Sequence, residues 1–323
     1  MSETSTIPSL FNILNIKNMV TSKIFDINNK KKLSSEISKC KPDIVMHLAA
    51  QALVVKSYKN PIETFSTNII GTANLLQSIR DVPSVKSCLV MTSDKAYDNK
   101  EWNHAYTEND PMGGNDPYSA SKGAAEIVVS SFRKSFFTQK NSPGIATIRA
   151  GNVIGGGDWA DYRLLPDCFK ALSSHKKIIL RNPQAIRPWQ HVLESLSGFL
   201  LIGSKLAKNP KRFEGAWNIG PSTLNDISVK SVVSKIVKQW GSGKVIIKKN
   251  NLREAQLLRL DSSKIFNLTK WKPTYSIEES IEKTVEWYMI HNKNKLDIHD
   301  FTISQIEDYI KKAQQMKNVW TKK

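Results

Sequence analysis

Residues 85–95 of the chain read VKSCLVMTSDK, and residues 117–122 read PYSASK. The run from Val85 to Thr92 is mainly apolar, which is typical of a strand buried on both faces of a parallel sheet. The pattern that begins at Pro117 and continues to Phe136 predicts a helix. A buried strand followed by a helix is the repeating unit of an α/β fold, so this stretch decides the fold class.

The same alternation of strands and helices extends to either side of that stretch. The run DIVMHLAA at 43–50 predicts another buried strand, and Pro61 opens the helix that follows it. We therefore expect a doubly wound, Rossmann-like parallel sheet. The elements predicted for it are strands at 22–27, 43–50, 85–92, 145–150 and 217–221, and helices at 28–39, 60–79, 117–136 and 191–206.

The regular alternation ends after Gly151, where a glycine-rich stretch begins. The shorter elements beyond it predict a smaller α+β lobe that interleaves with the first domain. They are helices at 163–173, 229–240 and 276–292 and strands at 177–180 and 244–248. The predicted boundaries are 1–151 for the sheet domain, to which helix 191–206 and strand 216–220 return, 152–190 and 221–310 for the lobe, and 311–323 for a basic tail that frays from Gln315 onward.

Composition narrows the class of protein. The chain has 323 residues, of which 40% are apolar, and this length suffices for one large core or two smaller ones. No apolar run is long enough to span a membrane and the N-terminus does not resemble a secretory signal, so we expect a cytoplasmic protein without membrane contact. Cys40, Cys88 and Cys168 lack paired spacing, which indicates free thiols in a reducing compartment.

The formal net charge of +18 leaves more than one interpretation open. The lysines are spread along the chain without an arginine-rich arm or a zinc-finger signature, which favours a solvated surface over nucleic-acid binding. A positive field would also attract an anionic small molecule. His47, His104 and His191 have no partners at ligand spacing, so we expect no metal site.

Three side chains of the opening stretch form a candidate catalytic group. Tyr118 and Lys122 are four residues apart and lie on one face of a helix. A nearby ammonium favours the phenolate, so we expect the pKa of Tyr118 to be lowered towards the working range. Ser93 can hydrogen-bond the same substrate oxygen. Together they provide a base, the cation that tunes it and a positioning hydroxyl, as the oxidation of an alcohol requires.

This pattern resembles the extended branch of the short-chain dehydrogenase/reductase superfamily, and within it the CDP-glucose 4,6-dehydratase family. The resemblance covers about residues 7–309. The motifs that carry it are TSDK at 92–95, PMGGNDPY at 111–118, RAGNVIGGGDW at 149–159 and RNPQAIRPWQHV at 181–192.

The resemblance implies a lyase that uses NAD as a catalytic cofactor and CDP-glucose as its nucleotide-sugar substrate. Tyr118 would take the proton of the sugar 4-hydroxyl while hydride passes from C4 to NAD. Water would then be eliminated across C5 and C6, and hydride would return to C6 to give CDP-4-dehydro-6-deoxyglucose. Such products enter deoxysugar and polysaccharide biosynthesis, and relatives are commonly dimers, which implies a homodimer through helices 60–80 and 117–136.

Two further residues are assigned to the elimination. Asp94 is the expected acid, because a carboxyl in a poorly solvated site can stay protonated near neutral pH. Lys95 is the expected base at C5 and stands where dTDP-glucose dehydratases carry Glu. It can act as a base only if burial or a neighbouring cation such as Lys122 depresses its pKa. The catalytic residues expected are Ser93, Asp94, Lys95, Tyr118 and Lys122.

The cofactor and the substrate each have expected contacts. Asp26 and Ile27 would meet the adenine end of NAD, and Asn68 would bend a helix near the active site. The cofactor-binding residues expected are Asp26, Ile27, Leu48, Ala49, Ala50, Gln51, Asn68, Thr92, Tyr118 and Lys122. For the substrate, Asn152 would bind the sugar or its phosphate, Arg187 would clamp the pyrophosphate with Arg181 nearby, and Trp189 would stack on the pyrimidine.

The chain departs from the family in one respect. The family's dinucleotide fold begins with a strand, a Gly-x-x-Gly-x-x-Gly turn and a helix, which let backbone amides approach the pyrophosphate. The first glycine of this chain is Gly71. We therefore expect an N-terminally truncated sheet without the phosphate cradle, which places tight NAD binding in question.

Three alternatives to this function remain at this point. The chain could be another nucleotide-sugar enzyme, either a dTDP-glucose dehydratase or a 4-epimerase, although an epimerase would have no use for Asp94 and Lys95. It could be a catalytically impaired paralogue. Charge alone suggests the third alternative, a nucleic-acid binder.

Overall fold

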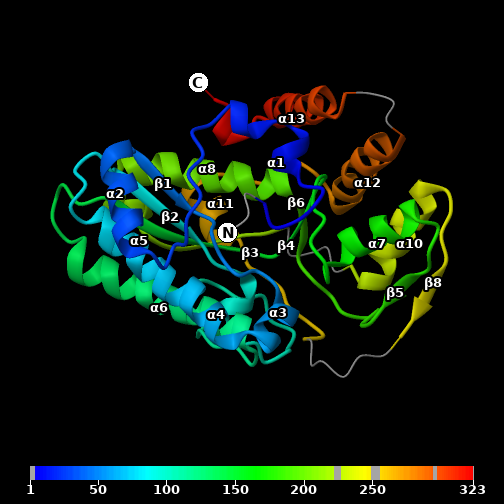
Figure 1. The fold of residues 1–323 in the computed structure, drawn as a ribbon, viewed down its shortest axis with the longest axis horizontal. Helices are drawn as coiled ribbons and strands as arrows, with labels where there is room; N and C mark the ends of the chain where they lie inside the picture. Colours follow the sequence, from blue (N-terminus) through cyan, green and yellow to red (C-terminus); the bar gives the residue numbers. More distant parts are fainter. Residues whose placement is uncertain (1–3, 222–226, 249–254, 294–296, 323) are drawn as a thin grey trace.

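A four-stranded parallel sheet with the order β1-β2-β3-β7 forms the centre of the first domain (Figure 1). The computed structural model describes residues 4–221, 227–248, 255–293 and 297–322. Val90 pairs with Thr147, and Ile148 pairs with Trp217, in parallel register. The carboxyl ends of these strands therefore lie at the same end of the sheet. The strands are β1 (Ile44–His47), β2 (Ser87–Met91), β3 (Gly144–Ala150) and β7 (Gly215–Ile219).

Helices cover both faces of this sheet, as Figure 1 shows. Side chains alternate between the faces, so that Val90 packs with Leu76 on one side and Leu89 packs with Phe199 on the other. The first face carries α2 (Lys30–Cys40), α5 (Gly71–Ile79) and α6 (Pro117–Phe136), and the second carries α8 (Val192–Lys208) and α11 (Ser263–Thr269). The predicted doubly wound α/β class is confirmed, and α6 has the predicted bounds.

The helix predicted at 60–79 is continuous in space but changes its winding. It consists of α4 (Pro61–Phe65), the π-helical segment η2 (Ser66–Ile70) and α5, and is preceded by α3 (Val54–Lys59). Pro61 occupies the first turn, where its missing N–H has no intrahelical partner to lose. A π-helical turn inside a helix carries an extra residue, and such turns are frequent at functional sites.

The smaller lobe has its own core. Trp287 and Tyr288 of α12 pack with Phe169 of α7, whose ring lies 3.9 Å from that of Tyr288. Trp159 packs against the same cluster. The lobe comprises α7 (Leu164–Ser173), α10 (Val229–Trp240), α12 (Ile277–Lys293) and the parallel pairs β4 (Asn152–Ile154) with β6 (Trp189–His191) and β5 (Ile178–Leu180) with β8 (Val245–Ile247).

Two predictions about the edge of the sheet are wrong. Residues 22–27 form no strand but an extended segment that ends in a turn, and its Phe25 and Ile27 pack on the core through their side chains. Strand β1 is also not buried on both faces. Among the described strands it pairs with β2, and Ile44 and Met46 are 37% and 39% exposed.

The C-terminal region is more closely packed than the sequence predicted. Helix α13 (Ile298–Gln315) is followed by the short helix η4 (Val319–Thr321). Asn318 is fully buried and donates to Thr274 Oγ1 at 2.9 Å, and Trp320 stacks on Tyr309. The prediction of a frayed tail is therefore wrong. The predicted lobe segment 221–310 is also too broad, because Ile265 and Trp271 pack in the core between the sheet and α8.

Four short elements complete the chain as described: α1 (Leu10–Ile13), η1 (Ile16–Asn18), η3 (Asp94–Ala96) and α9 (Pro210–Phe213). Within the described ranges, no helix combines the length and the apolar character needed to cross a membrane.

Candidate active site

The turn η3 follows the carboxyl end of β2 and carries the first part of the site. Ser93 caps this turn, because its hydroxyl accepts the Lys95 N–H at 3.2 Å and donates to Asp94 Oδ1 at 2.9 Å. Asp94 is buried, and its second oxygen, Oδ2, has no hydrogen-bond partner among the described residues. Burial raises the pKa of this carboxyl, as expected for an acid, although Lys95 and Ser93 oppose the shift.

Helix α6 carries the second part. Its start is fixed by Asp116, which caps the helix by accepting the Ser119 N–H at 3.0 Å. Pro117 follows at the first position, and the Tyr118 N–H donates to Ser57 Oγ at 3.1 Å. Tyr118 and Lys122 then lie one helical turn apart, and both are buried. The Lys122 ammonium donates to the carbonyl of Met91, the last residue of β2, at 3.1 Å.

The prediction that Lys122 lowers the pKa of Tyr118 is wrong for this structure. Burial raises the pKa of Tyr118 to about 12, while the interaction with the Ser93 hydroxyl acts in the opposite direction. The charge of Asp94 raises this pKa further, and that of Arg163 lowers it. Desolvation of the phenolate therefore exceeds the stabilisation from nearby cations.

Lys122 itself has a perturbed pKa. Burial lowers it to about 8, and the negative charge of Glu126, one turn further along α6, raises it against that effect. The charge of Lys122 in turn contributes to lowering the pKa of His47, which burial brings to about 4. His47 bonds to Thr72 Oγ1 at 3.0 Å, as a buried neutral histidine does.

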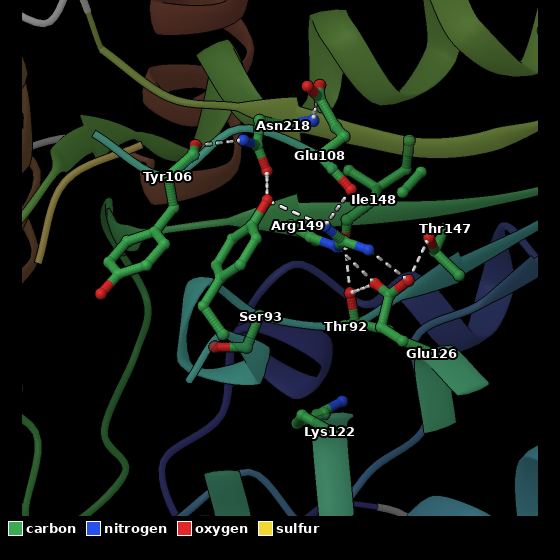
Figure 2. Close-up of polar contacts among 12 residues, drawn as sticks. Thr92, Ser93, Tyr106, Glu108, Lys122, Glu126, Thr147, Ile148, Arg149 and Asn218 are labelled. Carbon is green, nitrogen blue, oxygen red and sulfur yellow. Dashed lines mark hydrogen bonds and ion pairs between the residues drawn. The ribbon is translucent and has the colours of Figure 1, made fainter. Parts of the chain in front are cut away.

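A buried polar network lies behind the site, and the sequence analysis did not find it (Figure 2). Arg149 of β3 makes two bonds of 2.9 Å to the carboxylate of Glu126, through Nε and Nη2. Its Nη1 donates to the hydroxyl of Tyr97 at 2.9 Å, and that hydroxyl donates to Asn218 Oδ1 at 2.7 Å. The signals in the sequence were the spacing of four residues between Lys122 and Glu126 and the position of Arg149 at the start of the motif at 149–159.

The residues expected to contact a cofactor fall into two groups. Leu48 and Ala49, directly after β1, are exposed, with Leu48 at 55%, and Ala50 is partly buried. Asn68 and Thr92 instead have side chains engaged within the protein. Asn68 lies in the π-helical segment and bonds to the backbone N–H and carbonyl of Gln51 and to Ser121 Oγ. Asn68 thus holds the 48–51 loop against α6.

The hydroxyl of Thr92 donates to Glu126 Oε1 at 2.6 Å, so it belongs to the buried network. Asp26 is exposed, and its Oδ1 accepts the Asn28 N–H. Ile27 is half-buried and lies against Gly71, where a Cβ would come within 2.6 Å of its Cγ2.

A pocket opens in front of η3 and the start of α6. Its lining includes Lys95, Asp116, Arg187 and Tyr58. The Arg187 guanidinium donates to the carbonyls of Ile186, Ala255 and Gln256. Its charge also lowers the pKa of Asp94. The structure thus brings Arg187 together with the catalytic turn.

The other expected substrate contacts lie apart from this pocket lining. Arg181 pairs with Asp167 at 3.5 Å, and Asn152 lies on β4 with its backbone N–H donating to Pro188. The structure argues against a stacking role for Trp189, because this side chain packs in the core of the lobe and is 5% exposed. The large flat ring of Trp189 contributes to the packing of this core instead.

Comparisons with known proteins agree with this geometry. Residues 2–284 match the family described as GDP-mannose 4,6 dehydratase. The chain is 45% identical over 289 residues to the CDP-glucose 4,6-dehydratase of Salmonella typhimurium, covering 88% of this chain and 80% of that protein. It is 26% identical to the CDP-paratose 2-epimerase of Salmonella typhi, with 81% and 82% covered.

Among solved structures, the dTDP-glucose 4,6-dehydratase of Bacillus anthracis in complex with NAD has a TM-score of 0.74. It is 22% identical, and the likeness covers 90% of this chain and 87% of that one. A UDP-glucuronic acid 4-epimerase of Bacillus cereus also has a TM-score of 0.74, with 20% identity and coverage of 87% and 88%. Both share the fold of this chain.

Proposed function

Because this chain belongs to the GDP-mannose 4,6 dehydratase family, we propose that it is an NAD-dependent lyase that dehydrates CDP-glucose to CDP-4-dehydro-6-deoxyglucose. The observation that carries the proposal is the buried carboxyl of Asp94, whose Oδ2 has no partner among the described residues and whose pKa is raised. A carboxyl whose protonated form is favoured by burial, beside a tyrosine and a lysine, fits an elimination that follows an oxidation. The similarity to the Salmonella CDP-glucose 4,6-dehydratase supports CDP as the nucleotide.

The residues near the candidate active site fit a nicotinamide cofactor. The loop at 48–50, whose first two residues are exposed, follows the carboxyl end of β1, where dinucleotides bind in sheets of this type. Asn68 fixes this loop beside α6, because it hydrogen-bonds to both Gln51 and Ser121. Lys122 is close enough to His47, the residue before the loop, for its charge to lower the pKa of that histidine. The loop and Lys122 would hold the nicotinamide ribose, and Asp26 would meet the adenine end. When bound, NAD supplies the acceptor and the later donor of hydride.

In the oxidation half, Tyr118 accepts the proton of the sugar 4-hydroxyl. Because burial raises the pKa of Tyr118, the phenol holds its own proton in this structure and would have to give it up as it takes that of the sugar; the Ser93 hydroxyl, within hydrogen-bonding reach, would relay the released proton. The Lys122 ammonium is held by its hydrogen bond to the Met91 carbonyl, and it would orient the reacting groups near Tyr118. A ketone at C4 then makes the hydrogen on C5 acidic.

In the elimination half, Lys95 in its neutral amine form would remove the C5 proton, and Asp94 would donate its proton to the leaving 6-hydroxyl. Both residues belong to η3, which supports a joint role of the two side chains at adjacent carbons. Asp94 Oδ2 is buried and has no hydrogen-bond partner among the described residues, so the substrate would have to reach it as it binds. Arg187 lines the same pocket and would bind the pyrophosphate, with Arg181 and Asn152 contributing further along the substrate.

A homodimer completes the proposal. Several large apolar side chains are exposed on α4, η2 and α6, which pack side by side and are the helices through which relatives were expected to pair. They include Ile62 at 76%, Ile70 at 54% and Ile127 at 63% exposed. Large apolar side chains exposed together on neighbouring helices support an interaction surface there. We place the enzyme in the cytoplasm, where its nucleotide-sugar substrate and a reducing compartment for its three free cysteines are found.

The test is incubation of the purified protein with NAD and CDP-glucose, followed by mass spectrometry of the nucleotide-sugar. Loss of one water from the sugar supports the proposal. A product of unchanged mass with altered stereochemistry would instead indicate a 4-epimerase. Parallel reactions with dTDP-glucose and GDP-mannose test the choice of nucleotide, and faster dehydration of either would overturn the CDP assignment.

A further inference from the structure

The two halves of the catalytic group stand on different elements. Tyr118 and Lys122 belong to α6, whereas Asp94 and Lys95 belong to η3. The oxidised sugar must be presented to both without leaving the site, so the spacing between the two elements matters to the reaction. The buried network connects these elements through a short chain of side chains (Figure 2).

Arg149 lies at the centre of that chain. On one side it makes a two-point ion pair with Glu126, which is on the same helix as Lys122 and one turn beyond it. On the other side it donates to the hydroxyl of Tyr97, which directly follows η3 and ends it. The guanidinium also lies over the Tyr97 ring, with Cζ 4.8 Å from its centroid.

Each end of this chain is anchored to the sheet. Glu126 accepts hydrogen bonds from Thr92, directly after β2, at 2.6 Å and from Thr147, in the middle of β3, at 2.7 Å. Tyr97 donates to Asn218 of β7. The Arg149 and Glu126 side chains are each 5% exposed. The pair is therefore surrounded by protein instead of solvent, and the neighbouring groups hold its geometry.

A buried ion pair of this kind is weak evidence for added stability, because desolvation offsets most of its Coulombic gain. A phenylalanine would also fill the space of the Tyr97 ring without bringing a hydroxyl into the core. We propose that Arg149 is a positioning residue that, through Tyr97, sets the acid and base of η3 in register with Tyr118 and Lys122 of α6. This inference rests on the proposed two-stage reaction.

The variant that tests it is Tyr97→Phe, which keeps the ring and removes the hydroxyl link. Tyr309→Phe is the matched control, since the Tyr309 hydroxyl is also buried and bonded, to Glu194 Oε2 at 2.9 Å, but lies outside the network. Arg149→Lys, which keeps the charge and lacks the two-point geometry, is a second test of the same link.

We expect Tyr97→Phe to slow the loss of water about tenfold, the change typical of one lost hydrogen bond, while oxidation of the sugar is little affected. In a single turnover, reduced nicotinamide should therefore accumulate in this variant and in Arg149→Lys, but not in wild type or Tyr309→Phe. An equal fall in both halves would show that the link is merely structural and overturn the inference.

A second readout needs neither substrate nor cofactor. Hydrogen–deuterium exchange of the backbone amides of residues 94–97 should become about tenfold faster in Tyr97→Phe than in wild type, and should be unchanged in Tyr309→Phe. Unchanged exchange in Tyr97→Phe would overturn the inference. If wild type did not turn over CDP-glucose, the proposed function would fail, while the exchange result would still decide whether Arg149 and Tyr97 fix the turn.

Discussion

At the scale of single residues, the site combines groups whose pKa values move in opposite directions. Burial raises the pKa of Asp94 and of Tyr118 and lowers that of Lys122. One desolvated environment thus favours a neutral acid, a neutral phenol and a more weakly held lysine proton. An acid that keeps its proton can donate it, and Lys122 can release a proton near neutral pH, whereas the phenol of Tyr118 must lose its proton before it can act as a base.

Asp94→Asn should abolish proton donation to the 6-hydroxyl while it preserves the shape of the side chain. We expect dehydration to fall by about 10²- to 10⁴-fold, the usual contribution of a general acid. The thermal midpoint should change little, because the variant exchanges one buried polar atom without a partner among the described residues, Oδ2, for another, Nδ2, in a side chain of the same shape. Mass spectrometry of the product and thermal unfolding measure the two effects. Dehydration at the wild-type rate would exclude Asp94 as the acid.

The pH dependence of turnover should report Lys122. With its pKa lowered to about 8, the ammonium is lost above that value, and turnover should fall as the pH rises through it. Glu126→Gln removes the charge that raises this pKa, so the alkaline limb of the pH–rate profile should move to lower pH. Lys122→Arg, which stays charged, should lack this limb if it retains activity. An unmoved limb in Glu126→Gln would contradict the assignment.

At the scale of elements, the sequence predicted the regular parts well. The helices at 117–136 and 229–240 have the predicted bounds, because both show clear apolar periodicity between capping residues. The strand at 22–27 was wrong because a short apolar run does not reveal whether a neighbouring strand exists. Helix α13 was not predicted because its apolar face is narrow. The burial of Tyr309 is explained only by its hydrogen bond to Glu194, which is distant in sequence.

The same distinction applies to the candidate site. Ser93, Asp94, Tyr118 and Lys122 could be found because they are close in sequence within two motifs. Arg149 and Tyr97 belong to the site through contacts between β3 and η3, which no local pattern encodes. The lowered pKa expected for Tyr118 failed for a similar reason, since spacing along a helix says nothing about burial.

Glu194 provides a test at the level of helix α8. Its carboxyl accepts the backbone N–H groups of Thr274 and Tyr275 and the hydroxyl of Tyr309, and burial raises its pKa to about 7. A raised pKa stabilises the folded protein below about pH 4.5, the ordinary value, and this contribution is lost as the pH rises through about 7.

We therefore expect the stability of wild type relative to Glu194→Gln to decrease by on the order of 3 kcal/mol between pH 4.5 and pH 8. Urea unfolding of both proteins across this range measures the difference, and other titrating groups cancel in the comparison. A difference that is constant with pH, or that grows as the pH rises, would contradict the sign argued here.

At the scale of the whole molecule, the proposed dimer predicts that one exposed side chain controls assembly. Ile127→Lys places a charge on the apolar surface of α6 and should convert the dimer to a monomer. Ile179→Lys on β5 is the control, because Ile179 is 53% exposed, close to the 63% of Ile127, and lies on another surface. Light scattering of the three proteins gives their masses. A monomeric wild type, or a dimeric Ile127→Lys, would overturn the proposal.

The half-exposed strand β1 has a practical consequence for handling the protein. Ile44 and Met46 present apolar surface beside backbone groups that no described strand pairs, and such an edge can recruit extended chains from other molecules. The flanking charges of Lys41 and Asp43 oppose that association only while salt does not screen them. Concentrated, high-salt preparations should therefore be the first to aggregate, through intermolecular β-structure rather than through unfolding.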